Sequence, residues 1–261
     1  MSTEWDATAY HCVAAPQTSW GEAVLARLVL AGGERVIDAG CGSGRLTASL
    51  LERLPHGRVL ALDRSRNMLE VARVNLRPAY AGRVQFVQAA LPLLPVAGWA
   101  DVVFSTATFH WIGDHPALFA NLRVALRPGG RLHAQCGGGP NLEHAHALAE
   151  TVMARPAFAS CFAGWPGPWE FASAEITASR LRAAGFVDVA TEVVAAPTTL
   201  ATETDYRAFV TTVIYHPHLA RLPEALRPRF LDEVTALAAA ESPAFTLDYW
   251  RLNMTAATPP G

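Results

Sequence analysis

The sequence predicts an α/β fold in which seven mostly parallel strands form one sheet with helices on both faces. In the first half of the chain, short apolar segments alternate with helical patterns, as parallel strands joined by right-handed crossovers do. A glycine-rich loop at residues 40–44 follows the first apolar segment, and Asp63 ends the second. A loop and a carboxylate at adjacent strand ends indicate a ligand site at that edge of the sheet.

The first half contains five expected strands and three expected helices. The strands lie at residues 33–38, 58–63, 83–88, 101–105 and 131–135, and the helices between them at 44–54, 67–76 and 116–126. Ser65 should cap the second helix, which we expect to end before Pro78 because proline interrupts helices. Pro128-Gly129-Gly130 should end the third helix.

The second half is expected to complete the sheet and to cover it. We expect helices at 143–154 and 173–184, strands at 187–194 and 246–256, and a loop at 158–168 that is rich in Phe, Trp, Gly and Pro. Residues 204–240 are mostly helical in pattern, with breaks near Pro217, Pro223 and Pro228. We interpret this insertion between the last two strands as a helical cover. The whole chain is expected to form one domain, with a helical lid at 1–30, a core at 31–140 and a C-terminal half at 141–261.

Composition excludes several classes of partner. The chain has 261 residues, a formal net charge of −2 and no basic run, so we expect no nucleic-acid partner. The start lacks the charged-then-apolar order of a signal peptide. The apolar stretch 24–30 is too short to span a membrane, so we expect a cytoplasmic protein with a small-molecule partner. The four cysteines lack metal-site spacing, so no metal is expected, and nothing indicates a particular oligomeric state.

The strongest motif is the sequence V-I-D-A-G-C-G-S-G at residues 36–44. A dinucleotide site needs G-x-G-x-x-G, but Arg45 or Thr47 occupies the third glycine position in the two possible frames. Asp38, just before the loop, would repel a pyrophosphate and could instead bind an ammonium group. Asp63, at the end of the second strand, is placed to accept hydrogen bonds from ribose hydroxyls.

Four segments in order resemble the class I S-adenosylmethionine-dependent methyltransferases. They are D-A-G-C-G-S-G at 38–44, L-A-L-D-R-S-R-N-M-L at 60–69, D-V-V-F-S-T-A-T-F-H-W at 101–111 and L-R-P-G-G-R-L at 126–132. Within that class, the chain is similar to the trans-aconitate methyltransferase-like group, through an early W-D, Tyr10, Q-x-x-W-G at 17–21 and F-H-W-I at 109–112. The resemblance covers roughly residues 5–135 and implies a Rossmann-like fold, S-adenosylmethionine as cofactor and S-adenosylhomocysteine as product.

The resemblance also implies a set of cofactor-binding residues. They are Tyr10, Asp38, Gly40, Cys41, Gly42, Gly44, Asp63, Arg64, Met68, Ala90, Leu91, Ser105 and Thr106. Asp38 would serve the amino group of the cofactor, Asp63 its ribose and Tyr10 its carboxylate. Where the family often has an acid that contacts adenine, this chain has alanine, so the backbone amide of Leu91 would contact the ring instead.

The acceptor is expected beyond the fourth strand, near His110 and Trp111, with Tyr215 and Arg251 as further candidates for substrate binding. A hydroxyl acceptor would need His110 as a general base. A carboxylate acceptor is already nucleophilic and needs orientation, ideally by an arginine. Arg207, Arg221 and Arg251 are the arginines considered for that role.

These observations favour methyl transfer to a small molecule, with oxygen methylation of a small acidic metabolite as the leading hypothesis. Methylation of a hydroxyl group with His110 as the base is one alternative. A protein that binds S-adenosylmethionine as a sensor, without transferring the methyl group, is another. A nicotinamide-dependent oxidoreductase is disfavoured by the incomplete glycine pattern.

Overall fold

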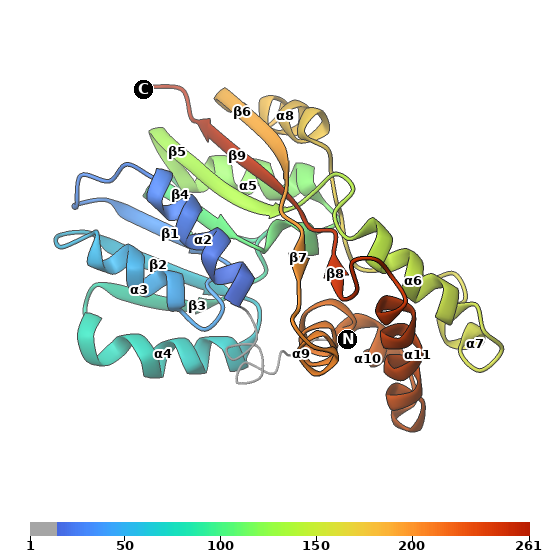
Figure 1. Cartoon of the computed structure of the whole chain (residues 1–261). Helices are drawn as coiled ribbons and strands as arrows, with labels where there is room; N and C mark the ends of the chain where they lie inside the picture. The colour runs from blue at the N-terminus through green and yellow to red at the C-terminus, as the bar shows by residue number, and fades with distance from the viewer. Residues whose placement is uncertain (1–14) are drawn as a thin grey trace.

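A seven-stranded sheet forms the centre of the computed structural model, which describes residues 15–261 (Figure 1). The strands follow the order β3-β2-β1-β4-β5-β9-β6. Their bounds are β1 (Arg35–Ala39), β2 (Arg58–Asp63), β3 (Val84–Gln88), β4 (Ala100–Thr106), β5 (Leu126–Gly137), β6 (Val187–Ala195) and β9 (Trp250–Ala257). β9 is antiparallel to β5 and β6, and the pairs from β3 to β5 are parallel. The predicted fold class is therefore confirmed.

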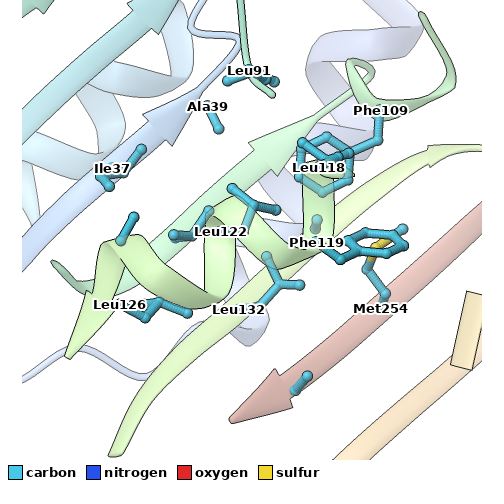
Figure 2. Close-up of a cluster of buried hydrophobic side chains, with 14 of the residues drawn as sticks. Ile37, Ala39, Leu91, Phe109, Leu118, Phe119, Leu122, Leu126, Leu132 and Met254 are labelled. Carbon is cyan, nitrogen blue, oxygen red and sulfur yellow. The ribbon is translucent and has the colours of Figure 1, made fainter. Parts of the chain in front are cut away.

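Helices pack on both faces of the sheet because successive strand side chains face opposite sides. Val36 joins a buried cluster with Leu50 and Leu51 of α3 (Arg45–Glu52), on the face that also carries α2 (Ala15–Arg27) and α4 (Arg66–Tyr80). Its neighbour Ile37 joins a second cluster with Leu122 of α5 (His115–Ala125), shown in Figure 2. α8 (Ala174–Ala183) packs beside α5 on this second face.

A second apolar core holds together the helical cover at the side of the sheet (Figure 1). The cover consists of α6 (Glu143–Met153), α7 (Ala159–Phe162), α9 (Glu203–Phe209), the π-helical turn η2 (Val210–Ile214), α10 (His216–Arg221), η3 (Glu224–Leu226) and α11 (Arg227–Ala239). Tyr206, Phe209 and Phe230 are among its buried side chains. The elements from α9 to α11 lie between β6 and β9 in the chain, where the sequence predicts the helical insertion at 204–240, whereas α6 and α7 lie between β5 and β6.

Three local predictions differ from the structure. α4 continues through Pro78, and Val74, four residues earlier, is 74% exposed, so water can bond to the carbonyl that proline leaves without a donor. The expected loop at 158–168 contains α7, because Phe162 packs against Phe230 in the core of the cover, with ring centroids 5.8 Å apart. The expected strand at 246–256 is divided into β8 (Thr246–Leu247) and β9, and β8 pairs with β7 (Thr198–Thr199), which was not predicted.

The expected breaks in the cover coincide with its prolines. Pro217 and Pro228 each lie in the first turn of a helix, α10 and α11, where a missing backbone N–H costs little. None of the helices between residues 15 and 261 combines the length and the apolar character needed to cross a bilayer.

Candidate active site

A cavity of about 330 Å³ opens where β1, β2 and β4 end, between the sheet and the helical cover. This is the edge at which open α/β sheets bind ligands, and the volume suits a small molecule. Eleven of the predicted site residues line it: Gly40, Gly42, Asp63, Arg64, Met68, Ala90, Leu91, Thr106, His110, Trp111 and Arg251. A smaller adjoining cavity of about 80 Å³ is lined by Asp38 and Cys41 and shares Gly40, Gly42 and Thr106 with the first.

The three glycines of the loop have different surroundings. Gly40 has φ +86° and lies under Thr108, whose side chain would overlap any Cβ added at Gly40. Gly42 has φ +53°, and a Cβ there would meet no atom within 4 Å, because this glycine faces the cavities. Gly44 instead packs on α4, where an added Cβ would lie 2.8 Å from Leu76. Gly44 therefore supports the loop without lining either cavity.

Asp63 holds the glycine loop in place through its carboxylate. Oδ2 accepts a hydrogen bond of 2.9 Å from the Gly42 N–H, and Oδ1 accepts one of 2.8 Å from the Ser65 N–H. Burial raises the pKa of Asp63, and these backbone hydrogen bonds act against that rise. The same carboxylate lines the main cavity, so it is placed both to shape the loop and to contact a ligand.

Asp38 is a buried acid beside the smaller cavity. It is 3% exposed, and its Oδ2 accepts a hydrogen bond of 2.6 Å from the Thr47 hydroxyl. Burial raises the pKa of Asp38 to about 7, and the charge of Asp63 adds to the rise. A cationic group placed next to Asp38 would therefore favour its ionised form.

His110 lies in η1 (Phe109–Trp111), just beyond β4, and is 9% exposed. Its Nδ1 accepts a hydrogen bond of 3.2 Å from the Gly137 N–H. The neutral ring must therefore carry its proton on Nε2. Burial lowers the pKa of His110 well below its ordinary value, and the nearby charge of Arg251 lowers it further. His110 is thus a neutral side chain with an Nε2–H donor.

Of the three arginines considered for an acceptor, Arg251 lines the cavity. It projects from β9, is 5% exposed and lies with its guanidinium 4.6 Å from the centre of the Trp20 ring. Its Nε donates to Gln135 Oε1 at 3.4 Å. Arg207 pairs with Asp232 on the outside of the cover, and Arg221 donates to the Cys161 carbonyl. Neither of these two arginines lines the cavity.

Three predicted site residues between residues 15 and 261 line neither cavity, namely Gly44, Ser105 and Tyr215. The Ser105 hydroxyl donates to the Ala39 carbonyl at 2.6 Å, so it joins β4 to β1 beneath the loop. Tyr215 is fully buried in the cover, and its hydroxyl donates to the Ala145 carbonyl at 2.9 Å. Both hydroxyls are thus bonded within the protein and neither residue lines a cavity, so a contact of Ser105 or Tyr215 with a ligand stays a prediction. Tyr10 lies outside the described residues.

Several lining residues were not predicted. They are Gln17, Asn141, Leu142, His146, Trp169, Phe171, Val213, Ile214 and Tyr249. The aromatic residues that follow position 158 were the available signal for Trp169 and Phe171, but the sequence does not show that this segment folds back over β4. Within residues 15–261, no group of three or more His, Cys, Asp or Glu side chains is arranged to hold a metal ion.

Comparison with known proteins identifies the family. Residues 36–130 match a methyltransferase domain. The trans-aconitate 2-methyltransferase of Methylobacterium nodulans is 34% identical over 241 residues, which are 91% of this chain and 85% of that protein. The trans-aconitate 2-methyltransferase of Deinococcus radiodurans is 33% identical over 221 residues, which are 82% of each.

A solved structure shares the fold. The phosphoethanolamine N-methyltransferase 2 of Haemonchus contortus, in complex with S-adenosyl-L-methionine, superimposes with a TM-score of 0.62 at 18% identity, over 97% of this chain and 56% of that one. The glycine loop, the two aspartates and the cavity beyond β4 occur together in a chain with these relatives. The chain therefore belongs to the class I S-adenosylmethionine-dependent methyltransferases, within the trans-aconitate methyltransferase-like group.

Proposed function

We propose that this methyltransferase transfers the methyl group to a carboxylate oxygen of a small acid. The observation that carries the proposal is the state of His110, a neutral donor beside the buried Arg251. The relatives named above are methyltransferases of trans-aconitate, which is itself an acid, and this supports the same acceptor chemistry. We also propose that the whole chain acts as one domain, with residues 204–240 covering the acceptor.

The cofactor would lie across the two cavities. Asp38 would hold its ammonium group, and the open space beside Gly42 would hold its methionine part. Asp63 would accept hydrogen bonds from the ribose hydroxyls. Met68 and Leu91, which line the main cavity beyond Asp63, would flank the adenine. S-adenosylmethionine supplies an electrophilic methyl group bonded to a sulfonium sulfur.

Methyl transfer to a carboxylate needs no base. The carboxylate oxygen forms a bond to the methyl carbon while the carbon–sulfur bond breaks, and that bonding pair moves to sulfur. The products are a methyl ester and S-adenosylhomocysteine, and no proton is released. The protein therefore has to bind the carboxylate, orient it and exclude water, which are roles that Arg251 and the Nε2–H of His110 can fill.

A hydroxyl acceptor would require a different state of His110. To take a proton at Nε2, the neutral ring would have to carry its own proton on Nδ1, which would then face the Gly137 N–H. Two donors would oppose each other in a buried position, which is costly. The geometry therefore favours the carboxylate acceptor over the hydroxyl acceptor.

The test measures release of S-adenosylhomocysteine with a panel of carboxylic acids, phenols and alcohols. We expect activity with acids and a base-labile methyl ester as product. For the best acid, His110→Ala should raise KM and leave kcat nearly unchanged. If kcat instead falls by roughly 10²–10⁴, His110 acts as a general base and the proposal is wrong. Binding of the cofactor without turnover of any acceptor would indicate a sensor.

A further inference from the structure

We infer that the acceptor is a monocarboxylic acid with a flat, conjugated or aromatic body, and not an acid with several carboxylates. This inference rests on the proposed function and goes beyond it by naming the class of acid. Two independent features of the acceptor side of the cavity carry it, namely its charge and the shape of its wall.

The acceptor side carries one permanent positive charge. Of the two arginines that line the cavity, Arg64 follows Asp63 at the ribose side and Arg251 lies at the acceptor side. The sequence contains no lysine, and residues 1–14 contain no arginine, so the segment outside the described residues cannot add a cationic side chain of either kind. One arginine matches one carboxylate.

The histidines of the cavity do not add to that charge at neutral pH. Burial lowers the pKa of His146 to about 4, and it lowers the pKa of His110 well below its ordinary value. A tricarboxylate would bring two more negative groups into a buried site that offers them no further cation. Uncompensated buried charges are strongly disfavoured, so the site selects against such acids.

The wall beside this charge is aromatic. We call Trp111, His146, Trp169 and Phe171 the aromatic wall, and all four line the cavity. The rings of Trp169 and Phe171 are inclined by only 12°, and the ring centres of His146 and Trp169 are 4.6 Å apart at 29°. The ring centre of Trp111 lies 5.9 Å from that of Trp169, and the two rings are inclined by 47°. These rings give the wall an aromatic surface, and aromatic rings pack favourably against a flat conjugated ligand.

Aliphatic side chains complete the apolar lining. Val213 and Ile214 come from η2 of the helical cover, and Leu142 immediately precedes α6. These residues offer no donor to a second or third carboxylate. The cavity therefore combines one anchoring cation with a largely apolar chamber, which fits a single carboxylate attached to an apolar body.

The experiment compares matched acids with the wild-type enzyme. Cinnamate and trans-aconitate differ in charge, and benzoate and cyclohexanecarboxylate differ in flatness. We expect kcat/KM to be at least tenfold higher for cinnamate than for trans-aconitate, and higher for benzoate than for cyclohexanecarboxylate. Calorimetry with the protein saturated with S-adenosylhomocysteine should show the same order of affinities without turnover.

The possible outcomes separate this inference from the proposed function. If trans-aconitate is used as well as cinnamate or better, the inference is overturned while carboxylate methylation stands. If cyclohexanecarboxylate matches benzoate, the flat-body part is overturned. If only phenols or alcohols accept the methyl group, the proposed function fails and the inference fails with it.

A charge-adding variant provides a second test. His146→Arg places a second cation in the aromatic wall and should shift the ratio of kcat/KM values toward trans-aconitate by at least tenfold. His146→Gln is the matched control, because it removes the ring without adding a charge and should leave that ratio low. An unchanged ratio in a folded His146→Arg protein would contradict the charge argument.

Discussion

The glycine loop allows a sharp test, because Gly40 and Gly42 differ in what an added methyl group would meet. At Gly42 the backbone has φ +53°, inside the left-handed region that alanine can adopt at a cost of roughly 1–2 kcal/mol. No atom lies within 4 Å of the added Cβ. Gly42→Ala should therefore fold, with a loss of about 2–8 °C in Tm for a chain of this size.

The same substitution should damage cofactor binding, because the open space beside Gly42 belongs to the cavities. A methyl group there would occupy volume that we propose for the methionine part of the cofactor. We expect the affinity for S-adenosylhomocysteine to fall by roughly tenfold or more, equivalent to about 1.4 kcal/mol. Calorimetry measures the affinity, and thermal unfolding measures stability on the same preparation.

Gly40→Ala should lower stability more than Gly42→Ala does. Its Cβ would lie closer than 3.0 Å to three side-chain atoms of Thr108, and its φ of +86° is less suited to alanine. Overpacking and left-handed strain together should lower the free energy of unfolding by about 2–5 kcal/mol. Adding Thr108→Gly to the Gly40→Ala protein should recover the part of the unfolding free energy that is lost to overpacking. Wild-type affinity in Gly42→Ala, or no rescue of Gly40→Ala by Thr108→Gly, would refute the reasoning.

Three further predictions concern buried charged and titratable groups. Asp63→Asn should lower both Tm and cofactor affinity, because the amide cannot accept hydrogen bonds from the N–H groups of both Gly42 and Ser65 as the carboxylate does. The affinity should fall by roughly tenfold. Unchanged affinity would mean that the ribose is held elsewhere. Because the pKa of Asp38 is raised to about 7 in the folded protein, its contribution to stability is present at low pH and is lost as the pH rises from about 4 to 7. Cofactor binding near pH 6 should then release a proton, seen as buffer-dependent binding heat that disappears in Asp38→Asn. Burial lowers the pKa of His218 to about 3. Below about pH 6.5 the unfolded chain therefore binds a proton at this histidine that the folded chain does not bind. The free energy of unfolding should then fall by up to about 1.4 kcal/mol for each unit by which the pH is lowered. Urea unfolding at pH 7 and pH 5 should show a smaller loss of unfolding free energy in His218→Phe than in the wild type. An equal loss in the two proteins would contradict this prediction.

The cofactor half of the site could be predicted from the sequence because its signals are local. The loop glycines and Asp63 lie next to the strands that position them, and those strands are continuous apolar segments. Ser105 shows the limit of this reasoning. Side chains alternate along β4, so Thr106 lines the cavity while Ser105 faces Ala39. Both are polar residues at a strand end, and only the alternation along the folded strand distinguishes them.

The acceptor half depends on contacts between distant segments, which local patterns do not encode. Arg251 reaches the cavity because β9 lies between β5 and β6 in the sheet, although β9 follows β6 in the chain. His146 becomes part of the wall because Trp169 stacks on it from a separate loop. Tyr215 looked equally suitable from its position in the insertion, but its hydroxyl bonds to Ala145 inside the cover.

The turn that carries His110 links the two halves of the site. The Phe109 carbonyl accepts a hydrogen bond of 3.1 Å from His115 Nε2, and the His110 carbonyl accepts one of 2.9 Å from the Glu170 N–H. Thr108, which packs on Gly40, begins the same turn. A direct displacement needs the acceptor oxygen in line with the methyl carbon, which depends on relative position and not on proton transfer. A turn that holds His110 against the glycine loop would meet that need, and the hydrogen bond from the Gly137 N–H fixes the orientation of the His110 ring.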